Sequence, residues 1–197
     1  MRIIIVSFIV LILDQATKLI AKTNIRLGDS VSVIGDFFRF THIENRGMAF
    51  GIEVSNHFLF NLFSIIAALA ILYYLIAMRN QHIVPRFALA MIFGGAMGNL
   101  YDRILLGKVV DFFDFDFPNI NIPSFNLYFF DTPRIYLERW PIFNIADVAV
   151  SIGMMILIVT IFIHDKPFLS IIPGEEEQTS EEEEEEIGST AEKAESQ

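Results

Sequence analysis

Four apolar runs of roughly 20 residues each constrain this chain more than any other feature. They cover residues 3–21, 58–78, 87–106 and 142–163. At about 1.5 Å of rise per residue, a helix of roughly 20 residues crosses the ~30 Å hydrocarbon core of a bilayer. The helices of a soluble bundle would instead carry a polar stripe every ~3.6 residues, and the second and fourth runs contain none. The sequence therefore predicts an all-α membrane protein with four transmembrane helices.

The first run has two possible interpretations. Arg2 followed by an apolar core is typical of a cleaved secretory signal. However, Asp14 and Lys18 interrupt the core, and no convincing small-x-small cleavage site follows it. We therefore expect an uncleaved first helix.

Charge is segregated along the chain. The formal net charge is −10, and residues 175–197 alone hold eleven Glu against one Lys. Because this stretch has almost no apolar residues, it cannot bury enough surface to fold. We expect residues 1–174 to form the membrane domain and residues 175–197 to form an acidic, disordered tail, either solvating or used for interaction.

The segments between the predicted helices differ in character. The first contains strand-like stretches at 31–33 and 37–42, which predict a small extramembrane β-sheet. Residues 79–86 are expected to form a short polar loop containing Pro85. Residues 107–141 are aromatic and contain four prolines, and an outer loop of this length is often functional.

Several kinds of chemistry are excluded by composition. The chain has no cysteine, so disulfides, thiolate nucleophiles and Cys-ligated zinc or iron–sulfur centres are impossible. Its four histidines have no ligand spacing, and neither a His-Glu-x-x-His nor a Gly-x-Ser-x-Gly motif occurs. We expect no metal ion and no other cofactor.

Asp111 and Asp147 are the strongest candidates for chemistry. Each lies beside the end of an apolar run, and an ionisable side chain at membrane depth usually marks a functional site. Two neighbouring carboxyl groups cannot readily both ionise, so one keeps its proton. The ionised group can then take a proton from water while the protonated one polarises a carbonyl. Alternatively, both residues are ordinary interfacial acids at the ends of spans.

Asp14 and Lys18 are four residues apart, so they can pair on one helix face. Such a buried pair could belong to a site or could only fix helix packing.

The third run carries Gly94 and Gly98, a small-xxx-small pair that lets another helix approach closely. Asn99, Asp102 and Arg103 follow on a shared face. This crowding predicts a polar network near the site.

Two other classes of protein stay open at this point. A proton-coupled transporter or channel component could use Asp14, Lys18, Asp102 and Asp147 as a relay. A structural assembly protein is the third possibility. A relay would need acids distributed through the membrane depth, whereas these acids gather mostly toward one side, and an assembly protein would leave the motifs described next unexplained.

Five ordered motifs resemble a known family, the bacterial lipoprotein signal peptidases (signal peptidase II). The motifs are Asp14-Gln15-x-x-Lys18, Asn45-x-Gly47-x-Ala49-Phe50, Gly98-Asn99-Leu100-x-Asp102-Arg103, Val109-Val110-Asp111-Phe112 and Phe143-Asn144-x-Ala146-Asp147. Together they span the chain from residue 14 to the fourth run.

The resemblance implies an aspartic endopeptidase that removes signal peptides from prolipoproteins by cutting before a cysteine that carries diacylglycerol. It implies that Asp111 and Asp147 are the catalytic dyad. It also implies substrate-binding or dyad-supporting roles for nine further residues: Asp14, Lys18, Asn45, Gly47, Asn99, Asp102, Arg103, Asn144 and Ala146. Aromatic residues are expected to line the groove for acyl chains or signal peptide: Phe37, Phe38, Phe40, Phe112 and Phe113.

The resemblance further implies a multi-pass protein of the bacterial inner membrane with cytoplasmic termini and an active site at the outer face. Counting Lys and Arg in the loops does not supply this orientation, because the larger segments hold more of them. The implied partners are lipid-modified prolipoproteins and membrane lipids, not nucleic acid, and we expect a monomer. Residues 118–139 look like an insertion relative to compact family members.

Overall fold

The structure, a computed structural model, describes residues 2–45, 57–80, 82–116, 120–124, 126–127, 130–131, 135–137 and 140–163. Its long helices are α1 (Ile4–Asn24), α2 (His57–Ala77), α3 (Ile83–Leu106) and α4 (Ile145–Ile163). A short 3-10 helix, η2 (Met78–Asn80), extends α2. All four long helices have the length and apolar composition needed to cross a membrane. The predicted four-helix architecture is confirmed.

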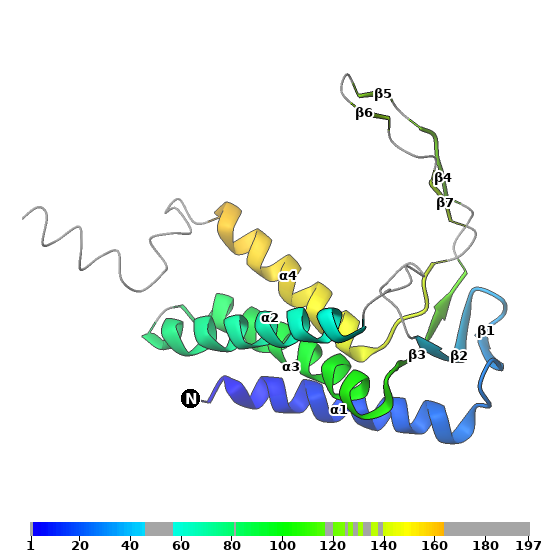
Figure 1. The fold of residues 1–197 in the computed structure, drawn as a ribbon, viewed down its shortest axis with the longest axis horizontal. Helices are drawn as coiled ribbons and strands as arrows, with labels where there is room; N and C mark the ends of the chain where they lie inside the picture. Colours follow the sequence, from blue (N-terminus) through cyan, green and yellow to red (C-terminus); the bar gives the residue numbers. More distant parts are fainter. Residues whose placement is uncertain are drawn as a thin grey trace, which may run out of the picture.

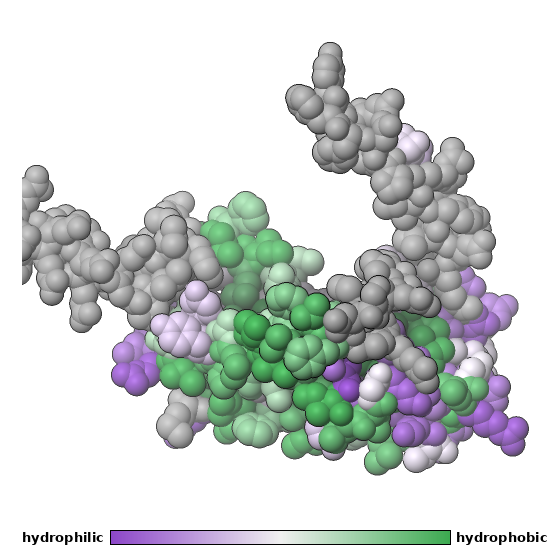
Figure 2. All heavy atoms as spheres, in the orientation of Figure 1, coloured by the Kyte–Doolittle hydropathy of each residue, from purple (hydrophilic) through white to green (hydrophobic). Residues whose placement is uncertain are grey.

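Helix α3 is the centre of the bundle, since it contacts α1, α2 and α4 (Figure 1). In the apolar stretch of α3 that could cross a membrane, 50% of the residues are buried inside the protein. The corresponding share is 11% for α2, which packs at the periphery of the bundle. The remaining helix surface is strongly apolar, as Figure 2 shows along the helical part of the molecule. Phe8 and Phe63 are more than half exposed there, as expected of side chains that face lipid rather than water.

Glycines set the spacing between the helices. A Cβ at Gly94 would lie 2.7 Å from the backbone oxygen of Ser7, so this glycine lets α1 approach α3. The predicted close approach at the Gly94/Gly98 face is confirmed. Gly95 and Gly153 hold α3 against α4 in the same way, and sequence reasoning did not single them out.

A three-stranded antiparallel sheet lies beside the C-terminal part of α1, which it contacts through β2 and β3 (Figure 1). Its strands are β1 (Ser30–Ile34), β2 (Phe38–Asn45) and β3 (Val109–Phe115), in the order β1-β2-β3. The small sheet was predicted, but only from its first two strands. Its third strand comes from the stretch that we expected to be outer loop, and this strand places Asp111 opposite Ile43.

Three helix boundaries differ by three or four residues from the sequence expectation. The first helix continues to Asn24 rather than 21. The third helix starts at Ile83 rather than 87, and Pro85 lies in its first turn instead of a loop. Proline is tolerated there because the first N–H groups of a helix have no partner within it. The fourth helix starts at Ile145 rather than 142, because Phe143 pairs with Phe113 instead of entering the helix.

The long segment between β3 and α4 contains four short strands in its described residues. Strand β4 (Ile120–Ile122) pairs with β7 (Ile135–Leu137), and β5 (Asn126–Leu127) pairs with β6 (Phe130–Asp131). Gly47 and the predicted tail at 175–197 lie outside the described residues.

Candidate active site

The two candidate aspartates lie on segments that are linked by backbone hydrogen bonds. Asp111 is in β3, and Asp147 is in the first turn of α4. The amide groups of Phe112 and Phe113 donate to the carbonyl oxygen of Phe143 at 3.1 and 2.8 Å, and the amide of Phe143 donates back to Phe113 at 3.1 Å. These bonds hold the strand that bears one aspartate against the chain that leads into the helix of the other.

Asp147 owes its position to the start of α4. The backbone amide of Asp147 donates to Asn144 Oδ1 at 3.1 Å, and the backbone amide of Asn144 donates to Asp147 Oδ2, also at 3.1 Å. This reciprocal pair is a capping box, in which two amides at the helix start satisfy each other through side chains. The Asp147 carboxylate is therefore held by the same contacts that begin the helix.

The Asn144 side chain links the two aspartates. It is fully buried, and its Nδ2 donates to Asp111 Oδ1 at 2.6 Å while its Oδ1 caps the helix at Asp147. Asn45 Nδ2 donates to the other Asp111 oxygen at 3.2 Å, and Asn99 Nδ2 donates to Asp147 Oδ1 at 2.8 Å. The predicted candidates Asn45, Asn99 and Asn144 are thus brought together around both carboxyl groups.

Asp111 is buried, although it lies in an edge strand of the sheet, and its pKa is raised. Its side chain is 3% exposed. Burial, followed by the negative charge of Asp147, raises the pKa of Asp111 to about 7, against hydrogen bonds from Asn45 and Asn144 and the charge of Lys18, which act in the opposite direction. A carboxyl group with this pKa holds its proton for much of the time at neutral pH.

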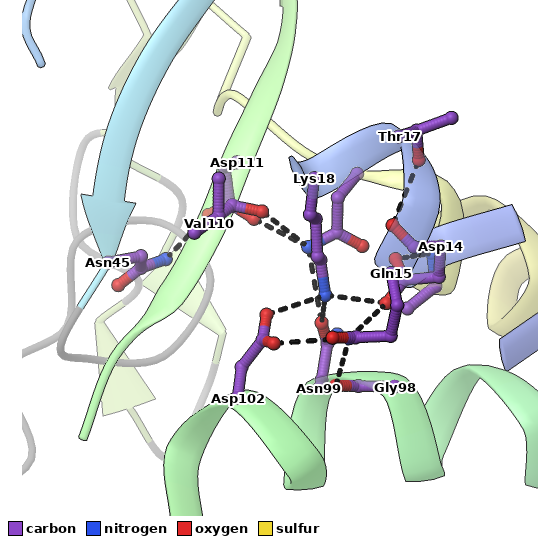
Figure 3. Close-up of polar contacts among 12 residues, drawn as sticks. Asp14, Gln15, Thr17, Lys18, Asn45, Gly98, Asn99, Asp102, Val110 and Asp111 are labelled. Atoms are coloured by element: carbon purple, nitrogen blue, oxygen red, sulfur yellow. Dashed lines mark hydrogen bonds and ion pairs between the residues drawn. The ribbon is translucent and has the colours of Figure 1, made fainter. Parts of the chain in front are cut away.

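A second cluster of carboxylates lies between α1 and α3 (Figure 3). Lys18 Nζ lies 2.7 Å from Asp14 Oδ2 and 2.9 Å from Asp102 Oδ2, and it donates to Asn99 Oδ1 at 2.9 Å. Asp14, Lys18 and Asp102 are all nearly inaccessible to solvent. The predicted pairing of Asp14 with Lys18 is present, and Asn99 belongs to both clusters.

This second cluster is also attached to α4. The backbone amide of Ala146 donates to Asp14 Oδ1 at 2.9 Å, which satisfies one of the free amides at the start of that helix. Gln15 Nε2 reaches Asp14, Asp102 and the Gly98 carbonyl at 3.1, 3.1 and 3.2 Å. We did not place Gln15 among the candidate site residues, although it adjoins Asp14 in the first motif.

Arg103, on helix α3, packs against a ring of α2. Its guanidinium carbon lies 4.8 Å from the ring centroid of Phe60 on α2. It interacts electrostatically with Asp147 and Asp111. In the described ranges, no ion pair joins it to either carboxylate.

With this geometry in view, comparison with known proteins is informative. The family model described as signal peptidase (SPase) II matches residues 6–163. The chain belongs to the signal peptidase II family. It is 38% identical over 173 residues to a lipoprotein signal peptidase of Desulforapulum autotrophicum, a match that covers 85% of this chain and 96% of that protein.

Other signal peptidase II relatives agree. A lipoprotein signal peptidase of Staphylococcus aureus is 34% identical over 158 residues, covering 80% of this chain and 86% of its own. A solved bacterial membrane enzyme aligns with a TM-score of 0.66 at 31% identity, covering 84% of this chain and 93% of that one. Together with its four apolar helices, family membership makes this chain a multi-pass bacterial membrane protease.

Proposed function

We propose that Asp111 and Asp147 are the catalytic pair of an aspartic endopeptidase. As a member of the signal peptidase II family, the protein removes signal peptides from prolipoproteins. The observation that carries the proposal is the shared contact of Asn144 with both aspartates. This contact holds the two carboxyl groups as one unit, and one of them has a pKa near neutrality.

The chemistry follows from one proton held between two carboxyl groups. Ionised Asp147 takes a proton from water, and the water oxygen attacks the scissile carbonyl carbon. Protonated Asp111 gives its proton to the carbonyl oxygen as the tetrahedral intermediate forms. When the intermediate collapses, Asp147 passes its proton to the leaving nitrogen and Asp111 recovers one from the intermediate's hydroxyl group, so the pair returns to its starting state.

The surroundings of the two aspartates support Asp147 as the base and Asp111 as the acid. Asp147 accepts hydrogen bonds from Asn99 and from the Asn144 backbone, which fix the orientation of its carboxyl group. Asp147 is also partly exposed, whereas Asp111 is buried. Water can therefore approach the proposed base, and desolvation favours the protonated form of the proposed acid.

Aromatic side chains lie near the dyad, on β2, on β3 and just before Asn144. The rings of Phe38 and Phe115 stack with centroids 4.6 Å apart, and Phe113 lies 5.5 Å from Phe143. We propose that this aromatic row contacts the acyl chains or the signal peptide. Of the five aromatic residues expected there, Phe112 is buried, and the exposed Phe37 is the more accessible.

The cleavage site and the topology belong to the same proposal. We place the cut before the diacylglyceryl-modified cysteine, the termini in the cytoplasm and the dyad at the outer face of the inner membrane. A lipid anchor in the outer leaflet would confine the scissile bond to that depth. We further propose that the enzyme is a monomer and binds no nucleic acid.

Cleavage in detergent tests this function directly. Purified protein is given a peptide that carries the diacylglyceryl cysteine, with the unlipidated peptide as control, and the released signal peptide is detected by mass. Activity without a gradient argues for the peptidase and against a transporter. Failure to cleave, or activity that EDTA abolishes and zinc restores, would contradict the metal-free aspartic mechanism.

The domain division is tested by truncation after Gly174. The family match ends at residue 163, and the acidic residues that follow contain none of the five motifs. We therefore propose that residues 1–174 are the peptidase domain, and that removing 175–197 keeps the cleavage rate within about tenfold, or ~1.4 kcal/mol of barrier. A larger loss at normal expression would assign the tail a role.

A further inference from the structure

We propose that Lys18 is a positioning residue for the reaction. Its ammonium group fixes which end of the Asn99 side-chain amide faces Asp147. This inference rests on the proposed catalytic role of Asp147 and deepens it.

The ammonium group of Lys18 is buried between two carboxylates and one amide oxygen. Its side chain is 4% exposed, and its nitrogen has acceptors at 2.7 Å on Asp14, 2.9 Å on Asp102 and 2.9 Å on Asn99. An ammonium group has three donors and no acceptor. Because the ammonium group can only donate, the Asn99 atom that faces Lys18 has to be its oxygen.

This contact determines what Asn99 presents on its other side. With its oxygen toward Lys18, the Asn99 nitrogen lies 2.8 Å from Asp147 Oδ1 and donates to it. Rotating the amide by half a turn would set its N–H groups against the ammonium and against Asn144 Nδ2, which lies 3.1 Å from the oxygen. The same rotation would set the Asn99 oxygen against the Asp147 carboxylate. One orientation satisfies all three neighbours, and the other satisfies none.

Asn144 alone is a weaker determinant of this orientation. Its amide N–H groups are divided among Asp111 at 2.6 Å, Asn99 at 3.1 Å and the Val110 carbonyl at 3.4 Å. Lys18 instead directs a charged donor at the Asn99 oxygen. A charged donor polarises the amide and strengthens the hydrogen bond that the amide gives in turn. The effect of Lys18 thus reaches Asp147 through Asn99.

A purely structural role makes a different prediction. If Lys18 only offsets the net charge of this cluster, then removing Asp102 together with Lys18 should restore the enzyme. The double variant Lys18→Met/Asp102→Leu keeps the net charge of the cluster, and apolar replacement of a buried ion pair is often tolerated. If Lys18 orients Asn99, the same double variant stays impaired.

The experiment measures single-turnover cleavage of the lipidated peptide, its binding and a thermal melt. We expect Lys18→Met and Lys18→Met/Asp102→Leu each to lose about 10–100-fold in cleavage rate, as for one charge-assisted hydrogen bond of ~1.5–3 kcal/mol, with binding nearly unchanged. Lys22→Met is the matched control, one helical turn further along α1 and exposed. A double variant that cleaves at the wild-type rate overturns the inference. It also keeps the test open if Lys18→Met alone does not fold.

A mutant cycle with Asn99 supplies a readout that a structural role would not move. In an Asn99→Leu background, adding Lys18→Met should cost less than about twofold, because the residue it acts through is already gone. A full independent loss in that background overturns the inference. If instead Asp111→Asn or Asp147→Asn cleaves normally, the dyad itself fails, so the two failures are distinguishable.

Discussion

Two clusters of carboxylates meet at Asn99, and they are balanced in different ways. Asp14 and Asp102 share the ammonium group of Lys18 at 2.7 and 2.9 Å. Asp111 and Asp147 receive amide donors instead. In the part of the chain that the structure describes, no Lys, Arg or His forms an ion pair with either of them.

The difference separates a structural use of buried charge from a chemical one. A carboxylate paired with a cation stays ionised, and breaking such a buried pair typically costs ~3–5 kcal/mol of stability. Amide donors orient a carboxyl group without neutralising it, so two such groups side by side retain a proton between them. The two carboxylates paired with Lys18 should therefore control stability, and the amide-held pair should control turnover.

The largest expected effect is on the amide-held pair. Asp111→Asn and Asp147→Asn keep the shape of the side chains and remove an ionisable group. Each should lower single-turnover cleavage of a lipidated peptide by several orders of magnitude, and the double variant should be little worse, since the groups act as a unit. Peptide binding should survive in all three. Near-normal cleavage by either single variant would remove the dyad from the mechanism.

The cation-paired cluster should respond to the same substitution in its stability. Both oxygens of Asp14 accept only, from Lys18, Gln15 and the Ala146 backbone. In Asp14→Asn, the new amide N–H groups would face donors on every side, so we expect a loss of about 3 kcal/mol in the free energy of unfolding.

A thermal melt in detergent measures that loss, with Asp36→Asn as control because the Asp36 side chain is 97% exposed. An Asp14→Asn protein that melts like wild type, yet fails to cleave, would show that Asp14 acts in turnover rather than in stability.

The sequence was sufficient for the elements that depend on hydropathy alone. The four apolar runs predict the four helices, and the i, i+4 spacing predicts the pairing of Asp14 with Lys18. The proximity of Asp111 and Asp147 was expected from the family resemblance and from their places at the ends of two runs. The interhelical fit at Gly94 and Gly98 also follows from small-residue spacing.

Other features depend on tertiary contacts that no local pattern encodes. Val109–Phe115 becomes a strand because β2 offers it a partner, whereas its sequence directly follows a helix and resembles an aromatic loop. The start of α4 is set by the reciprocal bonds of Asn144 and Asp147, which hydropathy cannot locate. Gly95 is needed because the Ala146 carbonyl lies against it, a contact between residues far apart in the sequence.

The pH dependence of cleavage is the next smaller effect. The pKa of Asp111 is raised to about 7, so the protonated acid that the mechanism requires is lost as pH rises through that value. We expect the single-turnover rate to fall by up to about tenfold per pH unit above ~7. Asp14→Asn, which does not touch Asp111, should show the same alkaline limb at whatever rate remains. A rate that stays flat to strongly alkaline pH would contradict the role of Asp111 as the acid.

The smallest expected effect is on stability: Asp111→Asn, although it should abolish most cleavage, should gain stability relative to wild type as pH rises. Because the pKa of Asp111 in the folded protein is raised from 3.8 to about 7, the folded state holds a proton between these values that the unfolded state has lost. Its contribution to stability is fully present at low pH and disappears as pH rises toward 7. Asn does not titrate, so Asp111→Asn should gain relative to wild type by ~1–2 kcal/mol between about pH 5.5 and pH 7.5, and the difference should then level off. Melts of both proteins over this range measure it, with the exposed Asp36→Asn as the matched control. A difference that is flat, or that shrinks with rising pH, would mean that Asp111 holds no proton in the folded state over this range, and the contrast between the two clusters would be lost.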